Sequence, residues 1–132
     1  MAANNELDRN SYEDWERFAE LMIEKTKAGR IDWTDLRRLR SQEVSRPGLI
    51  GPIFYTKFGS RPYEIAVYRY EYPYSVDEVR DEMRTETAIE FVDSDGMPSW
   101  TLPQVPSRRE LYDLLQFETA EAAEAFLTLQ DA

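Results

Sequence analysis

The sequence contains no cysteine and no histidine. Disulfide bonds, thiolate nucleophiles and imidazole acid–base chemistry are therefore excluded, as are zinc sites built from these two residue types. Glycine is also scarce, with five residues, and no P-loop, dinucleotide-binding fingerprint or Gly-x-Ser-x-Gly motif occurs. These absences argue against most kinds of catalysis, and we predict a protein that is not an enzyme and needs no cofactor and no metal.

Long apolar runs are missing as well. No stretch approaches the roughly 18 apolar residues of a membrane-spanning helix. The N-terminal stretch MAANNELDRNSYEDW is polar and acidic, unlike the apolar centre of a secretion signal. Because a chain without cysteine also suits a reducing compartment, we predict a cytoplasmic protein that does not bind membranes.

Basic residues are few, and lysine is the rarer of the two types. Lys25, Lys27 and Lys57 are the only lysines among 16 basic residues, and 26 acidic residues bring the net charge to −10. Such a charge repels nucleic acid and attracts cationic partners, so direct nucleic-acid binding is not expected. The acidity itself has three interpretations: a salt-adapted or GC-rich source, ordinary solubility, or a surface that imitates nucleic-acid phosphates.

The remaining composition is that of a folded chain. Of 132 residues, 42% are hydrophobic and 13% are aromatic, which is too apolar for a disordered chain. A chain of this length is expected to form one domain with a real core. We predict a flexible tail over residues 1–10 and a single α+β domain over 11–132.

An amphipathic helix is predicted to begin at Ser11. Ser11 followed by Asp14 resembles a capping box, and Gly29 after two lysines is typical of a helix end. Apolar residues recur at spacings of three and four, which predicts a buried stripe made of Tyr12, Trp15, Ala19, Met22, Ile23 and Thr26. Thr34 is then predicted to cap a brief second helix through Arg40, with Leu36 and Leu39 facing inward.

Four strands of an antiparallel meander are predicted between Ile53 and Leu102. The fold class is thus α+β, a four-stranded antiparallel meander packed against an N-terminal helix and C-terminal helices. Alternation in the second strand places Ile65 and Val67 on one face and the tyrosines on the other. The expected strands are 53–58, 63–72, 87–92 and 97–102, with turns at 59–62 and 93–96.

Further predictions concern the chain after the second strand and after the fourth. Pro73 is expected to end the second strand, and residues 75–83 form either a helical insert capped by Ser75 or a mobile hairpin loop. Ser107 with Glu110 predicts a capping box that opens a helix carrying Leu111, Leu114 and Leu115. A last helix over 119–130 is expected to bury Ala122, Ala123, Phe126 and Leu129.

Several segments together resemble a loose group of small bacterial proteins without assigned function. The segments are LMIEKTKAGRIDW, FVDSDG and ELYDLL, which carry a Gly-x-Ile-x-Trp link, an Asp-Gly turn and a Leu-Tyr-x-Leu-Leu helix. The resemblance covers about residues 15–116. It implies no binding or catalytic residue, and it weakly suggests a role in mobile elements or inter-bacterial conflict.

Acidic residues provide two candidate sites that we interpret structurally. The stretch Asp93-Ser94-Asp95-Gly96 is similar to the start of a calcium loop, but the twelfth position is Gln104 where that loop needs Glu. A tight hairpin turn explains it better. Within strands, Glu64 and Glu90 are expected to face solvent, so paired-carboxylate catalysis is not indicated.

Two surfaces are candidates for binding. The first is a row of tyrosines, Tyr68, Tyr70, Tyr72 and Tyr74, on the strand face away from the predicted helices. The second is a basic island, Arg37, Arg38 and Arg40 with Arg46, whose arginines either bind an acidic group or pair internally.

These features favour a non-enzymatic interaction module, an inhibitor or immunity-type protein that binds one protein partner, possibly a basic one. The first alternative is an acidic mimic that blocks a nuclease or another nucleic-acid-binding protein, as anti-restriction and anti-CRISPR proteins do. The second alternative is a small-ligand protein or enzyme with a closed pocket behind the meander. The sequence also allows a homodimer.

Overall fold

The computed structural model describes residues 11–35, 46–57, 64–93 and 97–132. Its strands form one antiparallel five-stranded sheet in the order β1-β2-β3-β4-β5. The predicted four-stranded meander with flanking helices is confirmed, and the short β1 is added at one edge. The elements are α1 (Tyr12–Lys27), β1 (Thr34–Asp35), β2 (Leu49–Thr56), β3 (Ile65–Asp77), β4 (Arg80–Val92), β5 (Pro98–Thr101), α2 (Ser107–Thr119) and α3 (Ala122–Gln130).

Helix α1 begins and ends as its sequence predicts. The hydroxyl of Ser11 accepts a hydrogen bond from the backbone N–H of Asp14. At the other end Gly29 has a φ of 72°, and the N–H of Arg30 donates to the carbonyl of Lys25, which closes the helix with a left-handed glycine. The predicted stripe is buried except for Tyr12, which is exposed.

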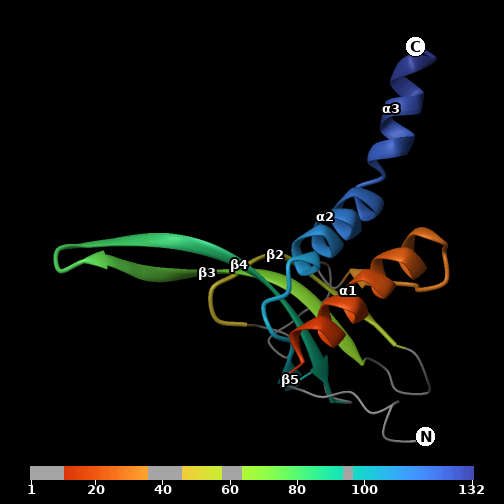
Figure 1. Cartoon of the computed structure of the whole chain (residues 1–132). Helices are drawn as coiled ribbons and strands as arrows, with labels where there is room; N and C mark the ends of the chain where they lie inside the picture. Colours follow the sequence, from red (N-terminus) through yellow and green to blue (C-terminus); the bar gives the residue numbers. More distant parts are fainter. Residues whose placement is uncertain (1–10, 36–45, 58–63, 94–96) are drawn as a thin grey trace, which may run out of the picture.

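Helices α1 and α2 lie over the same face of the sheet (Figure 1). Ile65 and Val67 of β3 point into the core beneath them, as the alternation predicts, and α2 contributes Leu111 and Leu115. Trp15 of α1 makes ring contacts with Trp100, at 4.7 Å between centroids, and with other aromatic residues near β5. This core leaves the opposite sheet face to the tyrosines of β3.

The prediction of a brief helix from Thr34 is wrong at its start. Thr34 lies in β1 and pairs with Tyr55 of β2. The hydroxyl of Thr56 donates to the carbonyl of Asp32 at 2.7 Å, which holds this segment beside β2. The backbone at Thr34 and Asp35 therefore pairs with β2 and does not begin a helix. Leu36 and Leu39 lie outside the described residues.

The longest described strands are β3 and β4, and here two predictions are wrong. β3 runs through Pro73 to Asp77, and residues 75–83 form neither a helix nor a loop but the end of a long hairpin. The N–H of Glu71 donates to the carbonyl of Gly48, directly before β2, so the nitrogen of Pro73 two residues later points to the same side, past the first residue of β2. Proline costs no ladder hydrogen bond there. We name residues 72–85 the β3–β4 arm; it projects from the body of the protein (Figure 1).

Two predictions about the C-terminal helices are wrong: the capping box at Ser107 and the burial of the last helix. Ser107 makes no capping box with Glu110; instead its hydroxyl and N–H both donate to Glu16 of α1, so a neighbouring helix satisfies the N-terminus of α2. Helix α3 buries none of its residues. Glu121 has a left-handed φ of 55°, which turns the chain, and α3 extends away from the sheet (Figure 1).

Candidate functional site

The tyrosines of β3 share the sheet face that α1 and α2 do not cover. We name this the tyrosine face; from β3 it carries Ala66, Tyr68, Tyr70, Tyr72 and Tyr74. Neighbouring rings lie close together, at 6.1 Å between Tyr68 and Tyr70 and 5.8 Å between Tyr70 and Tyr72. Exposure rises along the row: Tyr68 is buried, Tyr70 and Tyr72 are half-buried, and Tyr74 is exposed.

One end of the tyrosine face is closed. A second buried cluster lies there, made of Ile53, Tyr55, Ala66, Tyr68, Ala88 and Val92. Tyr68 therefore belongs more to this cluster than to an open surface, and the predicted binding role falls mainly to the tyrosines further along the strand.

A buried ion pair fixes Tyr68 in this cluster. Nε of Arg46 donates to Glu90 at 2.8 Å, and the hydroxyl of Tyr68 donates to the other carboxylate oxygen at 3.0 Å. The guanidinium of Arg46 also lies 5.6 Å from the Tyr68 ring centroid. Glu90 is 2% exposed, so the prediction that it faces solvent is wrong. For Arg46, the second interpretation of the basic island therefore holds: this arginine pairs with a carboxylate of the same chain.

The contacts with Glu90 determine the ionisation states of Tyr68 and Arg46. Burial, with the negative charge and hydrogen bond of Glu90, raises the pKa of Tyr68 far above its ordinary value, so the phenol stays protonated. Burial alone would lower the pKa of Arg46, but the hydrogen bond to Glu90 and nearby charges outweigh it and raise the pKa. The carboxylate thus holds a permanent cation and a permanent phenol donor.

Beyond Tyr68 the tyrosine face opens into a shallow groove. Its lining residues come from the loop before β2 and from strands β3 to β5: Pro47, Gly48, Tyr68, Tyr70, Glu71, Tyr72, Pro73, Ala88 and Thr101. Gly48 is required in its wall, because it has a φ of 72° and a Cβ there would collide with the carbonyl of Glu71. Ring faces and two prolines thus border a groove that is open to solvent, and Glu71 contributes its backbone to the wall beside Gly48.

The tyrosine row continues along the arm to Tyr74. The guanidinium of Arg84 lies over the ring of Tyr74, at 3.5 Å from its centroid. Glu82, directly across from Tyr74, lies 4.0 Å from Arg84. The exposed end of the tyrosine row is therefore framed by both signs of charge.

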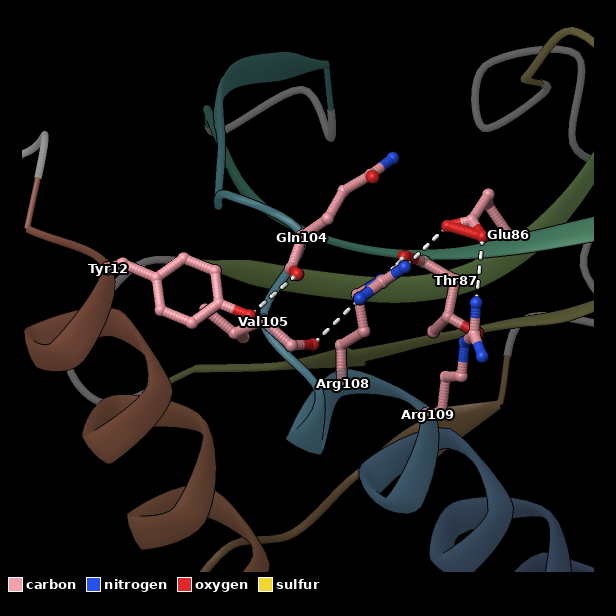
Figure 2. A network of polar contacts seen from close by, with 7 residues as sticks. All are labelled: Tyr12, Glu86, Thr87, Gln104, Val105, Arg108 and Arg109. Atoms are coloured by element: carbon pink, nitrogen blue, oxygen red, sulfur yellow. Dashed lines mark hydrogen bonds and ion pairs between the residues drawn. The ribbon is translucent and has the colours of Figure 1, made fainter.

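A second polar cluster fastens α2 to β4 (Figure 2). Nε of the buried Arg108 donates to the carbonyl of Thr87 at 2.9 Å, and one terminal nitrogen donates to the carbonyl of Val105 at 2.8 Å. The other terminal nitrogen pairs with Glu86, which also accepts from Arg109 at 3.0 Å. This cluster holds the start of α2 against the sheet edge just where β5 has ended.

Glu86 is held ionised by its two arginines. Burial by itself favours the neutral acid, but the hydrogen bonds from Arg108 and Arg109 outweigh burial and lower the pKa of Glu86. Burial, followed by the charge of Glu86, raises the pKa of Tyr70, which lies opposite on β3. The α2 cluster and the tyrosine row therefore share an electrostatic environment.

The other predicted site residues do not join this surface. Arg37, Arg38 and Arg40 lie outside the described residues. Arg69 of β3 lies on the helix-covered face, where its guanidinium stacks on Tyr112, at 4.3 Å from the ring centroid, and pairs with Asp113.

Sequence reasoning missed the interior roles of Glu90, Glu86 and Arg108. A signal existed for Glu90, because Ala88 and Val92 flank it on the same strand face and both are apolar. For Arg108 the pattern gave no signal, since a position in the first turn of a helix is normally solvated.

Among the residues that the structure describes, no group of three or more carboxylates is placed to hold a metal ion. In that same part of the chain, none of the helices combines the length and the apolar character needed to span a membrane. Comparison of the chain with models of known families, with curated proteins and with solved structures found no match, so the resemblance to small bacterial proteins gains no support.

Proposed function

We propose that the protein is a non-enzymatic interaction module that binds one protein partner through the open part of the tyrosine face. The observation that carries this proposal is the groove, where half-buried Tyr70 and Tyr72 rest on an ordered aromatic row and keep one side in solvent. Tyrosine in such a position offers a large contact area and a polar hydroxyl at a small entropic cost, because the ring is already held in place.

The chemistry of the groove favours an extended, basic segment of the partner. The net charge of −10 attracts cations to the molecule as a whole. Ring faces of Tyr70 and Tyr72 can accept arginine or lysine side chains as well as apolar ones. An inhibitor or immunity-type role in the cytoplasm remains part of this proposal.

The two alternatives have less support. The described ion pairs set arginines beside carboxylates, as at Glu86, which pairs with both Arg108 and Arg109, whereas a nucleic-acid mimic needs an unbroken acidic face. An enzyme site would need an activated group in a closed pocket. The groove is open, and the raised pKa of Tyr68 keeps it from acting as a base at neutral pH.

The test is capture of a partner from source-cell extract at low salt, followed by affinity measurement with the purified partner. Tyr70→Ala and Tyr72→Ala should each weaken binding by roughly 30-fold, the effect of losing a tyrosine hot spot. Tyr12→Ala is the matched control, since Tyr12 is an exposed tyrosine on α1, on the opposite side of the sheet.

Two results would oppose the proposal. One is the failure of the wild-type protein to capture any partner. The other is a captured partner that binds the folded Tyr70→Ala and Tyr72→Ala variants as tightly as it binds the wild type.

A further inference from the structure

The β3–β4 arm has one strand edge suited to pairing and one that is not. Along β3, the nitrogen of Pro73 points outward and cannot donate, and the pairing is irregular between Ser75 and Asp77. Proline and irregular pairing are the usual protections of a sheet edge. The extra residue of that irregularity lies on β3; along β4 the ladder is regular from Asp81 to the body of the sheet, and no proline interrupts it.

Hydrogen bonds near the body show which groups of β4 face this edge. The N–H of Leu102 donates to the carbonyl of Ile89, and Arg108 donates to the carbonyl of Thr87. Backbone groups of alternate residues point the same way, so those of Thr85 and Met83 also face outward. β5 pairs with this edge of β4 at residues 90–92, and the side chain of Arg108 bonds to it at Thr87. Within the described part of the chain, no strand pairs with the edge from Thr87 to the tip of the arm.

We propose that a second copy of this chain pairs with this edge, antiparallel, about a two-fold axis at Met83. Met83 then exchanges both backbone hydrogen bonds with its own counterpart, and Thr85 pairs with Asp81 of the second copy on either side of the axis. The two sheets join into one continuous sheet across the two arms. Strand addition of this kind is a general mode of recognition.

The charges of β4 select this register. With the axis at Met83, Glu82 lies opposite Arg84 of the second copy, and the symmetric pair repeats the contact. Residues 82 and 84 occupy the positions without hydrogen bonds, where side chains of opposed residues come closest. Met83 itself is 62% exposed and gains an apolar contact with its counterpart.

The neighbouring registers are unfavourable. An axis at Glu82 or at Arg84 would place each of these residues opposite its own counterpart, with like charges in contact. An axis at Asp81 would do the same and would shorten the paired segment, because β4 begins at Arg80. An axis at Thr85 would extend the pairing to Thr87, where the side chain of Arg108 lies at the strand edge, bonded to the Thr87 carbonyl, and would have to move.

This pairing places the tyrosine faces of both copies on the same side of the joined sheet. Each copy would present its own groove, so a partner with two binding segments would gain from the pairing. The proposal does not depend on the groove binding anything, since it rests on the backbone and charges of β4 alone.

The test measures self-association by sedimentation equilibrium from about 1 µM to 1 mM, because a short strand pairing is expected to be weak. Glu82→Arg or Arg84→Glu alone should weaken the dimer about tenfold, since each turns two attractive contacts into repulsive ones. The double variant carrying both changes should restore the wild-type dissociation constant to within about threefold.

Two further variants address the backbone. Met83→Pro removes the central N–H donor and should abolish the dimer, whereas Ser75→Pro, which removes an N–H from the other edge of the arm, should leave it intact. Met83→Cys introduces the only cysteine and should form a disulfide-linked dimer on mild oxidation, because paired Cα atoms at the axis lie within disulfide range. Val79→Cys, in the exposed turn, is the control.

A wild-type chain that stays monomeric to 1 mM would overturn the proposal. So would a dimer that Met83→Pro and the single charge reversals leave unchanged. Neither result depends on the tyrosine variants, so failure of this proposal is distinguishable from failure of the proposed function.

Discussion

At the scale of residues, the ion pair between Arg46 and Glu90 is the feature with the largest expected effect on stability. Both side chains are almost completely buried, and the contact of 2.8 Å lies within an apolar cluster. Removing one partner leaves the other charge buried, so Arg46→Met or Glu90→Leu should each lower the free energy of unfolding by about 3–5 kcal/mol.

Urea denaturation of the two single variants and of the double variant provides the check. The double variant replaces both charges with apolar groups, so it should be clearly more stable than the sum of the single losses predicts. Single losses below about 1 kcal/mol would contradict the assignment of a buried, coupled pair.

Glu86 predicts a pH dependence of stability. Its pKa is lowered in the folded protein, so its contribution is complete above the pKa of the unfolded chain and is lost as pH falls through the folded pKa. Glu86→Gln should therefore cost about 1–3 kcal/mol at pH 7, and the difference from wild type should shrink as the pH falls from about 5 to 3.

Denaturation curves at a series of pH values measure this difference. Glu82→Gln, an exposed carboxylate on the same strand, controls for the loss of one charge. A Glu86→Gln deficit that is constant between pH 7 and pH 3 would contradict the role of ionised Glu86 in holding α2.

Single residues also show what sequence patterns can and cannot predict. The alternation along β3 correctly assigned Ile65 and Val67 to the core and the tyrosines to the other face. On β4 the apolar neighbours Ala88 and Val92 indicated that the face of Glu90 is covered, but the pattern could not identify its partner, because Arg46 is distant in sequence. Period-two patterns report the face of a strand, while the covering of that face is decided by tertiary contacts.

At the scale of elements, the sequence predicted the end of an element correctly where the backbone hydrogen bonds at that end are made within the same element. Helix α1 begins after Ser11 and ends before Gly29, as predicted, because both residues complete the backbone hydrogen bonding of that same helix. The errors at Pro73 and Ser107 share the opposite cause. Pro73 is tolerated because it lies past the first residue of β2, and Ser107 bonds to Glu16 of another helix.

Helix α3 supplies a prediction at this scale. Its apolar side chains are exposed, for example Phe126 and Leu129, and it buries none of its residues. Ending the chain at Ala120 should therefore change the free energy of unfolding by less than about 0.5–1 kcal/mol. Leu115→Ala in α2, at a fully buried position, should cost about 2–5 kcal/mol by comparison.

Chemical denaturation of the shortened chain beside the full chain decides this point. If the shortened chain lost as much stability as Leu115→Ala, α3 would contribute to the core, and its separation from the sheet would be wrong.

At the scale of the whole molecule, part of the tyrosine face stays exposed because both packed helices lie on the opposite face of the sheet. α1 and α2 bury one sheet face, while β3 and β4 continue past the other strands and carry Tyr72 and Tyr74 outward. The sequence predicted the α+β architecture and the tyrosine row. The length of the arm and the closure of the face at Tyr68 depend on strand pairing between distant segments, which no local pattern encodes.

We propose that the open tyrosine face is the surface that contacts a partner in the cell. Incorporation of a photoreactive amino acid in place of Tyr72, and separately in place of Tyr12, tests it directly in source cells. We expect illumination to link position 72 to one protein of discrete mass, and position 12 to give no such product. Equal products from both positions, or a product from position 12 alone, would contradict it.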